Sequence, residues 1–415
     1  MKITGRAMLL ATCLAATLHA TESFMDRVDE ALTFSSPDSV VRARISGTVD
    51  LEAYRFSQPA PGLIETTDDA LFNPRLTTFL DVELGHRVYG FVQARIDRGF
   101  DPSDEELQAR VDEYAVRISP WDDGRASVQM GKFATVVGSW VQRHGSWDNP
   151  FVTAPLPYEN LTGVWDASGA NSSGTLLGWA HVLPRPTTPV PVTDKYLRLP
   201  IVWGPSYAKG VAVSGILGRL TYAAELKNGS LASRPDAWQE DRFFDGHQTA
   251  SGRLGYRPNP MWNFGASWSD GPYLRQEAGP TVPAGRRFDD YRQRVFAQDV
   301  SFAWHRLQIW AEAFQTRFVI PGVGNADTAA CYIEAKYKLT PQLAGALRWN
   351  QQTFGTIPHA GSQVRWGSNV SRVDAALNFR WSAHTEFKVQ YSLEHQVPGL
   401  RDYQHLLAFQ FVQRF

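Results

Sequence analysis

The chain has 415 residues, of which 41 are Lys or Arg and 42 are Asp or Glu, so its formal net charge is −1. A balance this even supplies no basic surface for nucleic acid or for an anionic membrane. The mean hydropathy is −0.30, and no run of about 18 apolar residues occurs outside the N-terminal segment, which excludes a transmembrane helix there.

The N-terminal segment has the form of a secretory signal peptide. Basic residues precede an apolar stretch, residues 7–18, and small residues follow it up to Ala20. This order is typical of an export signal, and we expect cleavage after Ala20. Residues 21–40 would then be a lead-in segment and residues 41–415 a single domain; the alternative is a buried N-terminal helix. Cys331 would be the one cysteine of the mature chain, which leaves no internal disulfide.

Alternation of apolar and polar side chains begins at residue 41. In the segment 41–54, one face is apolar and the other carries four charged residues and Tyr54. A period of two residues predicts a strand with two unlike faces. Segments 75–84 and 87–97 repeat the pattern and are separated only by Gly85 and His86, which predicts an antiparallel hairpin.

The same pattern recurs downstream as pairs of alternating stretches around short turns. These turns fall at residues 258–260, 305–306, 340–342 and 382–384. Hairpins with short turns on one side must have their other connections on the opposite side. The long connections are residues 98–106, 137–173, 184–196, 230–248, 270–291 and 354–369.

Short turns at one rim and long loops at the other are typical of an outer-membrane barrel. We therefore predict an all-β fold, a transmembrane antiparallel β-barrel of about 16 strands (between about 14 and 18), with short periplasmic turns and long extracellular loops. The expected location is the outer membrane of a Gram-negative cell, with its lipids as partners. A closed barrel also removes the unpaired edges of a sheet this large.

A secreted or surface all-β protein that binds or cleaves carbohydrate is the alternative. A mature chain of roughly 395 residues without a domain break is large for one sandwich and suits a barrel. Tryptophans near strand ends fit a girdle at a membrane interface. In the alternative they would fill a sandwich core or stack on sugars. The tryptophans concerned are Trp262, Trp268, Trp304, Trp310, Trp349 and Trp381.

Residues 138–166 stand apart because they hardly alternate and are rich in Trp, Pro and Asn. Long loops inside a compact fold are usually functional or disordered, and the aromatic content argues against disorder. We expect this segment to form a constriction in the lumen. Its polar lining would be Arg143, His144, Asp148, Asn149 and Glu159.

Arginines recur on the polar faces of three early strands. Stacked on neighbouring strands, they would form a basic wall opposite the constriction, and rings of fixed charge set pore selectivity. The alternative is that they are ordinary lumen charges, paired and solvated. The arginines are Arg42, Arg44, Arg75, Arg87 and Arg95, offset by Asp50, Asp81, Glu83 and Asp97.

The C-terminal strand resembles the signal that outer-membrane barrels present to the barrel assembly machinery. A terminal Phe415 follows apolar residues at alternate positions, namely Phe411, Phe409 and Leu407, whereas Gln413 departs from this pattern. The resemblance implies that the assembly machinery is a partner of this chain.

The segment DEYAVRISPWDDGRASVQMGKFATVVG resembles the phosphate-selective porin (O/P type) family, in which a strand, a short turn and a strand end on Gly-x-Phe. Later stretches, such as ASGRLGYRPNPMWNFGASW and NFRWSAHTEFKVQYS, are similar to it as well. The resemblance implies a porin barrel, passive diffusion of small hydrophilic solutes or ions, no cofactor and a homotrimer. Residues 134–136 read Ala-Thr-Val where the family often has Lys-Thr-Pro, so phosphate selectivity is not carried over.

The sequence shows no motif of a catalytic or metal site. His144 with Ser146 and Asp148 could suggest a hydrolase, but no nucleophile-elbow motif surrounds a serine. The histidines and cysteines show no zinc spacing. The acidic residues of loop 98–106 fit a solvated loop better than a calcium site, which needs six to eight oxygens in a defined arrangement. We expect no enzyme activity, no metal and no nucleic-acid partner.

Overall fold

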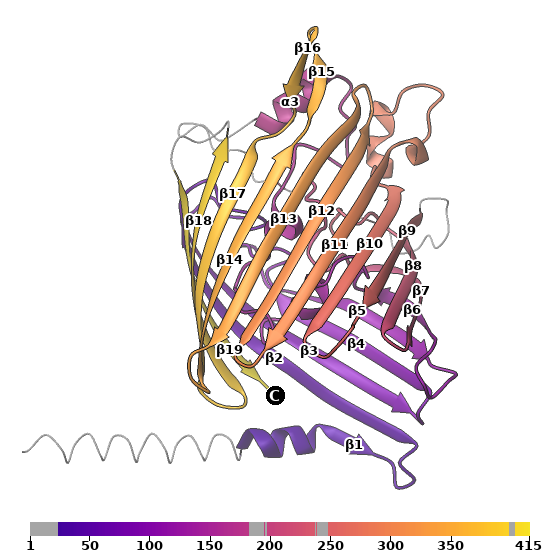
Figure 1. Ribbon diagram of the computed structural model, residues 1–415, viewed down its shortest axis with the longest axis vertical. Coiled ribbons are helices and arrows are strands. Elements are labelled where there is room, and N and C mark those ends of the chain that lie inside the picture. Colours follow the sequence, from indigo (N-terminus) through magenta and orange to yellow (C-terminus); the bar gives the residue numbers. More distant parts are fainter. Residues whose placement is uncertain (1–23, 182–194, 196, 237, 239–247, 398–402) are drawn as a thin grey trace, which may run out of the picture.

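The computed structural model describes residues 24–181, 195, 197–236, 238, 248–397 and 403–415. In this part of the chain seventeen strands form one sheet; β1 only extends β2, and the other sixteen close into an antiparallel barrel (Figure 1). The ring closes where β19 pairs with β2, from Leu406 opposite Phe56 to Arg414 opposite Thr48. The prediction of a closed barrel with about 16 strands is therefore confirmed.

The barrel strands are β2 (Val41–Phe56), β3 (Ala70–Leu84), β4 (Val88–Asp97), β5 (Gln108–Ile118), β6 (Ser127–Phe133), β7 (Ala208–Leu217), β8 (Leu220–Asn228), β9 (Gln248–Tyr256), β10 (Trp262–Pro272), β11 (Arg292–Trp304), β12 (Leu307–Ile320), β13 (Gly324–Lys338), β14 (Leu343–Phe354), β17 (Asn369–Arg380), β18 (Thr385–Val397) and β19 (Gln404–Arg414). The smaller elements are β1 (Thr33–Ser35), the hairpin β15 (Thr356–His359) and β16 (Ser362–Arg365), the helices α2 (Leu156–Glu159) and α3 (Ser173–His181), and the 3-10 turns η1 (Trp140–Arg143), η2 (Gln276–Thr281) and η3 (Phe288–Asp290).

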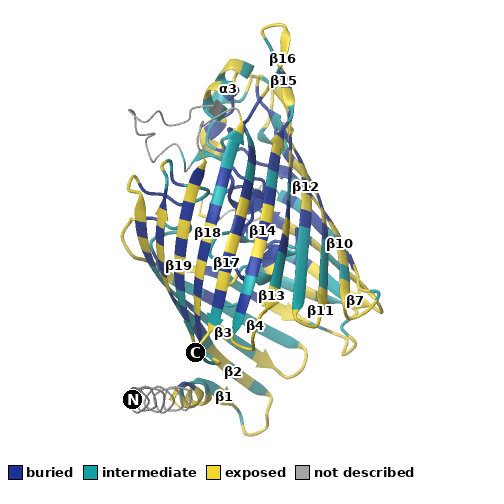
Figure 2. Ribbon diagram, turned by 60° about the vertical axis from the view of Figure 1, so that its left-hand side comes forward, coloured by how far each residue is buried: buried dark blue, intermediate teal, exposed yellow. Residues whose placement is uncertain are grey.

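The two faces of the barrel wall differ as the alternation predicts. On β18 the buried inward positions carry Lys388, Gln390 and Ser392, whereas Val389 and Tyr391 between them point outward and are 39% and 45% exposed. The same banding runs along the neighbouring strands in Figure 2. A sheet in water buries its apolar face, so this wall is the reverse of one in a water-soluble protein.

The turns at one end of the barrel are short. Gly218 and Arg219 alone join β7 to β8, and Gly218 has a φ of +63°, a left-handed conformation that glycine adopts without strain. The predicted turns at 305–306, 340–342 and 382–384 all lie between consecutive strands at this end. The pattern of one apolar face and abrupt turn residues was therefore sufficient to locate these hairpins.

The opposite end carries the long connections, with three departures from the prediction. The connections predicted at residues 137–173 and 184–196 belong to one stretch of chain, because β6 and β7 are consecutive barrel strands and α3 lies between them. Residues 57–69 form a long connection between β2 and β3 that the sequence pattern did not reveal. Residues 321–323 join β12 to β13 in a tight turn at this otherwise long-looped end. A chain segment passes close over that turn, because a Cβ on Gly322 would lie 2.1 Å from the carbonyl oxygen of Asn171.

The lead-in segment lies below the short-turn end of the barrel in Figure 1. Residues 24–31 are helical, and Asp29 forms an ion pair with Arg44 at 2.8 Å. None of the helices in the described part of the chain is long and apolar enough to cross a bilayer. The predicted signal peptide, residues 1–20, lies outside the described residues.

Candidate functional site

Residues 134–172, called here the inserted segment, run inside the barrel. Their apolar side chains form a core with inward-facing residues of the wall: Val137, Trp140 and Tyr158 pack in one cluster with Phe314 and Tyr332. Burial of aromatic side chains on both partners fixes the segment against the wall. The lumen therefore contains a hydrophobic core of its own.

A single carboxylate of β12 anchors the start of this segment. Glu312 accepts hydrogen bonds from the backbone N–H and the hydroxyl of Ser139, from the backbone N–H of Trp140 at 2.8 Å and from the hydroxyl of Tyr158 at 2.5 Å. Because four donors converge on this one carboxylate, it fixes the start of the segment against the wall. Gly138 must lack a side chain here, because a Cβ would lie 2.2 Å from the hydroxyl of Tyr158.

Strands β17 and β18 hold the middle of the segment through its backbone. Lys388 donates to the carbonyl oxygens of Ser146 and Asn149, the second at 2.7 Å. Gln390 accepts from the backbone N–H groups of Val152 and Thr153 at 2.7 and 3.1 Å. These contacts supply partners to backbone groups that a buried irregular segment cannot pair internally.

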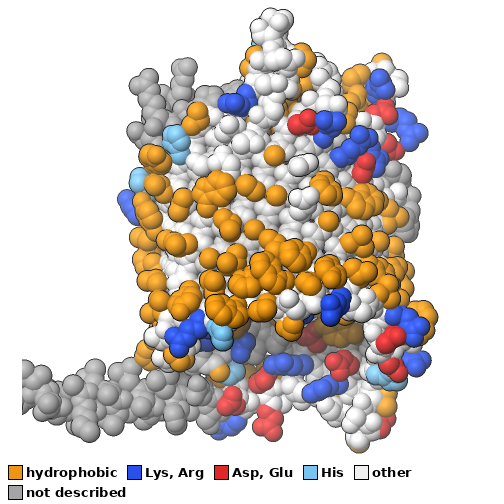
Figure 3. Space-filling view, viewed as in Figure 1, with side chains coloured by type: hydrophobic (Ala, Val, Ile, Leu, Met, Phe, Trp, Pro, Cys, Tyr) orange, Lys and Arg blue, Asp and Glu red, His pale blue; other side chains and the backbone are white. Residues whose placement is uncertain are grey.

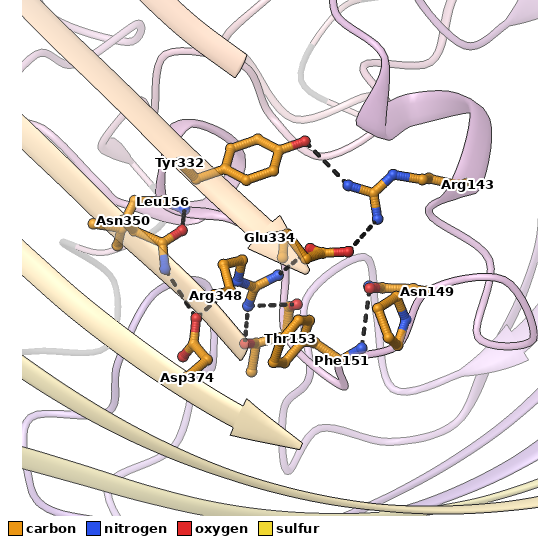
Figure 4. A network of polar contacts seen from close by, with 12 residues as sticks. Arg143, Asn149, Phe151, Thr153, Leu156, Tyr332, Glu334, Arg348, Asn350 and Asp374 are labelled. Atoms are coloured by element: carbon orange, nitrogen blue, oxygen red, sulfur yellow. Dashed lines mark hydrogen bonds and ion pairs between the residues drawn. The ribbon is translucent and has the colours of Figure 1, made fainter. Parts of the chain in front are cut away.

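A buried ionic network joins the segment to the wall (Figure 4). Glu334 of β13 pairs with Arg143 at 2.7 Å and with Arg348 at 3.7 Å, and Arg348 also pairs with Asp374 at 2.8 Å. The guanidinium of Arg348 donates to the carbonyl oxygen of Thr153 at 3.1 Å as well. Since each charge is matched, the network is stable as a whole, whereas loss of one member would leave a buried charge without its partner.

The network continues to Arg372 of β17. This guanidinium pairs with Asp374 at 3.2 Å and with Glu159 of the inserted segment. It also donates to the carbonyl oxygen of Ala154. The short helix α2, which ends at Glu159, is thereby tied to the wall at the same point as the preceding backbone.

A cavity of about 160 Å³ remains between the inserted segment and the wall formed by β17, β18, β19, β2 and β3. Its charged and polar lining includes Arg75, Glu159, Arg372 and Glu394, and its apolar lining includes Trp140. This volume is well above the roughly 10–15 Å³ that a single water needs.

Four of the predicted site residues line this cavity: Arg75, His144, Asn149 and Glu159. Arg143 lies in the adjoining ionic network.

Arg95 faces inward but pairs with Asp112 at 3.2 Å on a neighbouring part of the wall. Asp148 is exposed.

The structure does not bring the five predicted arginines together as one wall. Arg42, Arg44 and Arg87 lie at the short-turn end, where Arg44 pairs with Asp29 and Arg87 is 4.0 Å from Asp122. Arg75 lies opposite Asp50 of β2, eight positions further along that strand than Arg42. Because a strand rises about 3.3 Å per residue, Arg75 lies roughly 26 Å further along the wall than Arg42. Sharing one face of a strand does not place residues at one depth.

His144 is held as a neutral ring. Its Nδ1 lies 2.6 Å from the carbonyl oxygen of Val141, which can only accept, so Nδ1 donates and Nε2 accepts from the hydroxyl of Tyr207 at 2.9 Å. Burial lowers the pKa of His144 to about 4. Both ring nitrogens thus have partners other than Ser146 and Asp148, so these three residues do not form a catalytic set.

Several lining residues were not predicted, among them Arg372, Glu394, Gln404 and Gln410. Each occupies a polar position on an alternating strand, so the sequence marks them as inward-facing. Nothing in the alternation distinguishes them from the other inward positions, because the cavity is shaped by the inserted segment. Trp310 was expected in the outer girdle. The Cζ of Arg143 instead lies 4.5 Å from the centre of the Trp310 ring, inside the barrel.

A closed sixteen-stranded barrel with a charged inner wall and a long segment inside the lumen is the architecture of porins. Three solved outer-membrane channels share the fold with this chain. OmpF of Salmonella typhi, solved with daunomycin, is 11% identical with a TM-score of 0.55, and the match covers 92% of this chain and 100% of OmpF. The anion-selective porin of Comamonas acidovorans is 10% identical with a TM-score of 0.57 over 90% and 100%.

The outer-membrane channel DcaP of Acinetobacter baumannii is 10% identical with a TM-score of 0.53, over 92% of this chain and 99% of that one. No family model and no curated protein sequence matches the chain. At this level of identity, the likeness establishes the barrel fold and leaves the solute open. Among the described residues, no group of three or more His, Cys, Asp or Glu side chains is placed to hold a metal ion.

Proposed function

We propose that the protein is an outer-membrane channel through which small hydrophilic solutes or ions diffuse passively. The observation that carries this is the combination of an apolar outer surface with a charged lumen. Exposed outward residues include Leu254 and Leu347, at 68% and 63%, and Phe409 at 48%. Figure 3 shows the resulting apolar belt, with charged side chains gathered above and below it.

Such a belt suits hydrocarbon and would be a liability in water. Contiguous apolar patches larger than a few hundred Å² are rare on soluble monomers, whereas a lipid-facing band flanked by aromatic residues is what a membrane barrel requires. Trp262, Trp304 and Trp381 are exposed near the short-turn end, as an interfacial girdle would be. A secreted carbohydrate-binding protein offers no reason for this surface.

The inserted segment would act as the constriction. It packs against the inner wall and borders the cavity lined by Arg75, His144, Asn149 and Glu159. Channels select by the width and the fixed charges of their narrowest part. The short turns would face the periplasm and the long loops the exterior. The resemblance to the phosphate-selective porin family remains a proposal, as do the homotrimer and recognition by the assembly machinery.

The test is the conductance of purified, refolded protein in planar lipid bilayers. Discrete current steps are expected. Folded protein that gives none, and that stays soluble without detergent, would contradict the proposal and favour a secreted all-β protein.

A further inference from the structure

The cavity beside the inserted segment has one acidic group that forms no ion pair with any described residue. Glu394 of β18 lines the cavity and is only 5% exposed. Among the described residues, its carboxylate has one hydrogen-bond partner, the side-chain amide of Gln396 at 3.4 Å, and no ion pair. Its cross-strand neighbours are Arg372 and Gln404. Buried carboxylates are normally paired with a cation or fully hydrogen-bonded. Glu394 therefore has the capacity to bind a cationic ligand.

The two arginines that line the cavity are not available to an anion. Arg75 pairs with Asp50 at 3.2 Å and with Glu52 at 2.6 Å. Arg372 pairs with Asp374 and Glu159. A guanidinium whose donors already face two carboxylates has little left for a phosphate or carboxylate ligand.

The charges around the cavity leave a negative excess. The network of Arg143, Arg348 and Arg372 with Glu334, Asp374 and Glu159 holds equal numbers of both signs. The group on β2 and β3 holds one arginine and two carboxylates.

Glu394 adds a further carboxylate, so the excess amounts to two negative charges. His144 contributes no positive charge at neutral pH, since burial lowers its pKa to about 4.

Apolar and aromatic side chains form one part of the lining, beside polar residues such as Asn149 and Gln404. Tyr54, Trp140 and Phe151 border the cavity, together with Ile64 and Leu406. Aromatic faces attract cations as well as apolar groups. A volume of about 160 Å³ admits a ligand larger than a water or a bare ion.

We propose that this cavity is a binding subsite for small organic cations that carry an ammonium group on an apolar body, with Glu394 as the counter-ion. The ammonium group pairs with the Glu394 carboxylate, and the apolar body lies against Tyr54 and Trp140. The subsite rests on the proposed channel function and gives that channel a solute class. It disfavours phosphate and other anions, in spite of the arginines nearby.

The experiment adds phenethylammonium to single channels that carry a potassium chloride current, and it compares this probe with 3-phenylpropionate and inorganic phosphate. Phenethylammonium should block at concentrations at least about tenfold lower than either anion, the difference expected when a charged hydrogen bond is available to one probe alone. Equal block by 3-phenylpropionate would overturn the proposal.

Glu394→Gln should raise the half-blocking concentration of phenethylammonium about tenfold. Glu113→Gln is the matched control, because Glu113 also faces inward from a strand and accepts from the backbone N–H of Ala134 at 2.7 Å, but does not line the cavity. If Glu394→Gln leaves the half-blocking concentration unchanged, or if Glu113→Gln raises it as much, the block arises from diffuse charge and the subsite is overturned.

Calorimetric titration of the detergent-refolded protein with phenethylammonium tests the subsite without any current. Binding that Glu394→Gln abolishes supports the subsite even if no steps are seen, in which case the channel function alone fails. Current steps from a protein that does not bind phenethylammonium would refute the subsite and leave the channel function standing. Normal current steps or a heat-dependent gel shift would show that each variant is folded.

Discussion

At the scale of single residues, the inner wall depends on carboxylates that each serve several donors. Glu52 accepts hydrogen bonds from Arg75, Tyr54, Asn73 and Gln410, at 2.6, 2.8, 2.9 and 2.8 Å. Charge-assisted hydrogen bonds are stronger than neutral ones. The interior of this barrel therefore contains linked ionic clusters. Substitution of one residue removes hydrogen bonds or ion pairs from several others.

Replacing Arg348 should destabilise the protein strongly. This side chain is fully buried and serves both Glu334 and Asp374. Arg348→Ala leaves two buried carboxylates short of a partner, at a cost of about 3–5 kcal/mol. The measurement is the midpoint of denaturant unfolding in detergent. Arg317→Ala is the control, since its pair with Asp327 is exposed and should contribute little; similar midpoints in both variants would contradict the account.

Acid should loosen the inserted segment through His144. The ring is neutral where it is bound, and its pKa there is about 4 against an ordinary 6.5. The His144 ring therefore takes up a proton more readily when the segment is detached from the wall than when it is attached. The attachment is unaffected above about pH 6.5 and weakens as the pH falls from there toward about 4. The charged groups that act on the ring are Arg95 and Arg75, which lower its pKa, and Asp112, which raises it.

Open-channel current noise between pH 7 and pH 5 measures this effect. Noise should rise in the unmodified protein and stay constant in His144→Gln, whose side chain does not titrate. An acid response of the same size in both proteins would exclude His144 as its origin.

At the scale of elements, alternation identified the strands because it is a local property of the sequence. Each strand shows its two faces within about ten residues, and turn residues mark its end. The segment 138–166 was singled out for the opposite reason, its lack of alternation. Its contacts could not be predicted, because Glu312 is 173 positions away from Ser139, and no local pattern encodes such a pairing.

Deleting residues 143–157 should raise the single-channel conductance, by at least about twofold if this part of the segment sets the narrowest width. The deletion removes the backbone that Lys388 and Gln390 hold against the wall. Deleting the exposed loop residues 284–286 is the control and should leave conductance as it was. An unchanged conductance in the first variant would show that the segment does not limit flow.

Removing Phe415 should impair assembly into the membrane. Its backbone exchanges two hydrogen bonds with Gly47, at 2.9 and 3.0 Å, and so completes the pairing that closes the barrel. Its ring lies over Gly47, where a Cβ would be 2.6 Å from the ring. Phe387→Ala is the control, since it removes an exposed aromatic residue from the adjacent strand. Equal membrane yields of the two variants would contradict a special role for the terminal residue.

At the scale of the whole molecule, the sequence was enough to predict a closed barrel and its approximate strand number. It was not enough to place the cavity. Arg75 and Arg42 share an alternating pattern, yet one lines the cavity and the other lies at the short-turn end. Depth in the barrel depends on register between strands, and residues such as Glu394 acquire their surroundings only when the inner segment has folded.

The most direct test of the channel is a conductance measurement on refolded protein in a planar bilayer with a potassium chloride gradient. We expect discrete current steps, with a reversal potential whose sign reports preferred passage of cations, because carboxylates outnumber arginines among the buried groups in and around the cavity. Folded protein without current steps would contradict the channel itself. Steps with the opposite sign of reversal potential would retain the channel and contradict the charge assignment of its constriction.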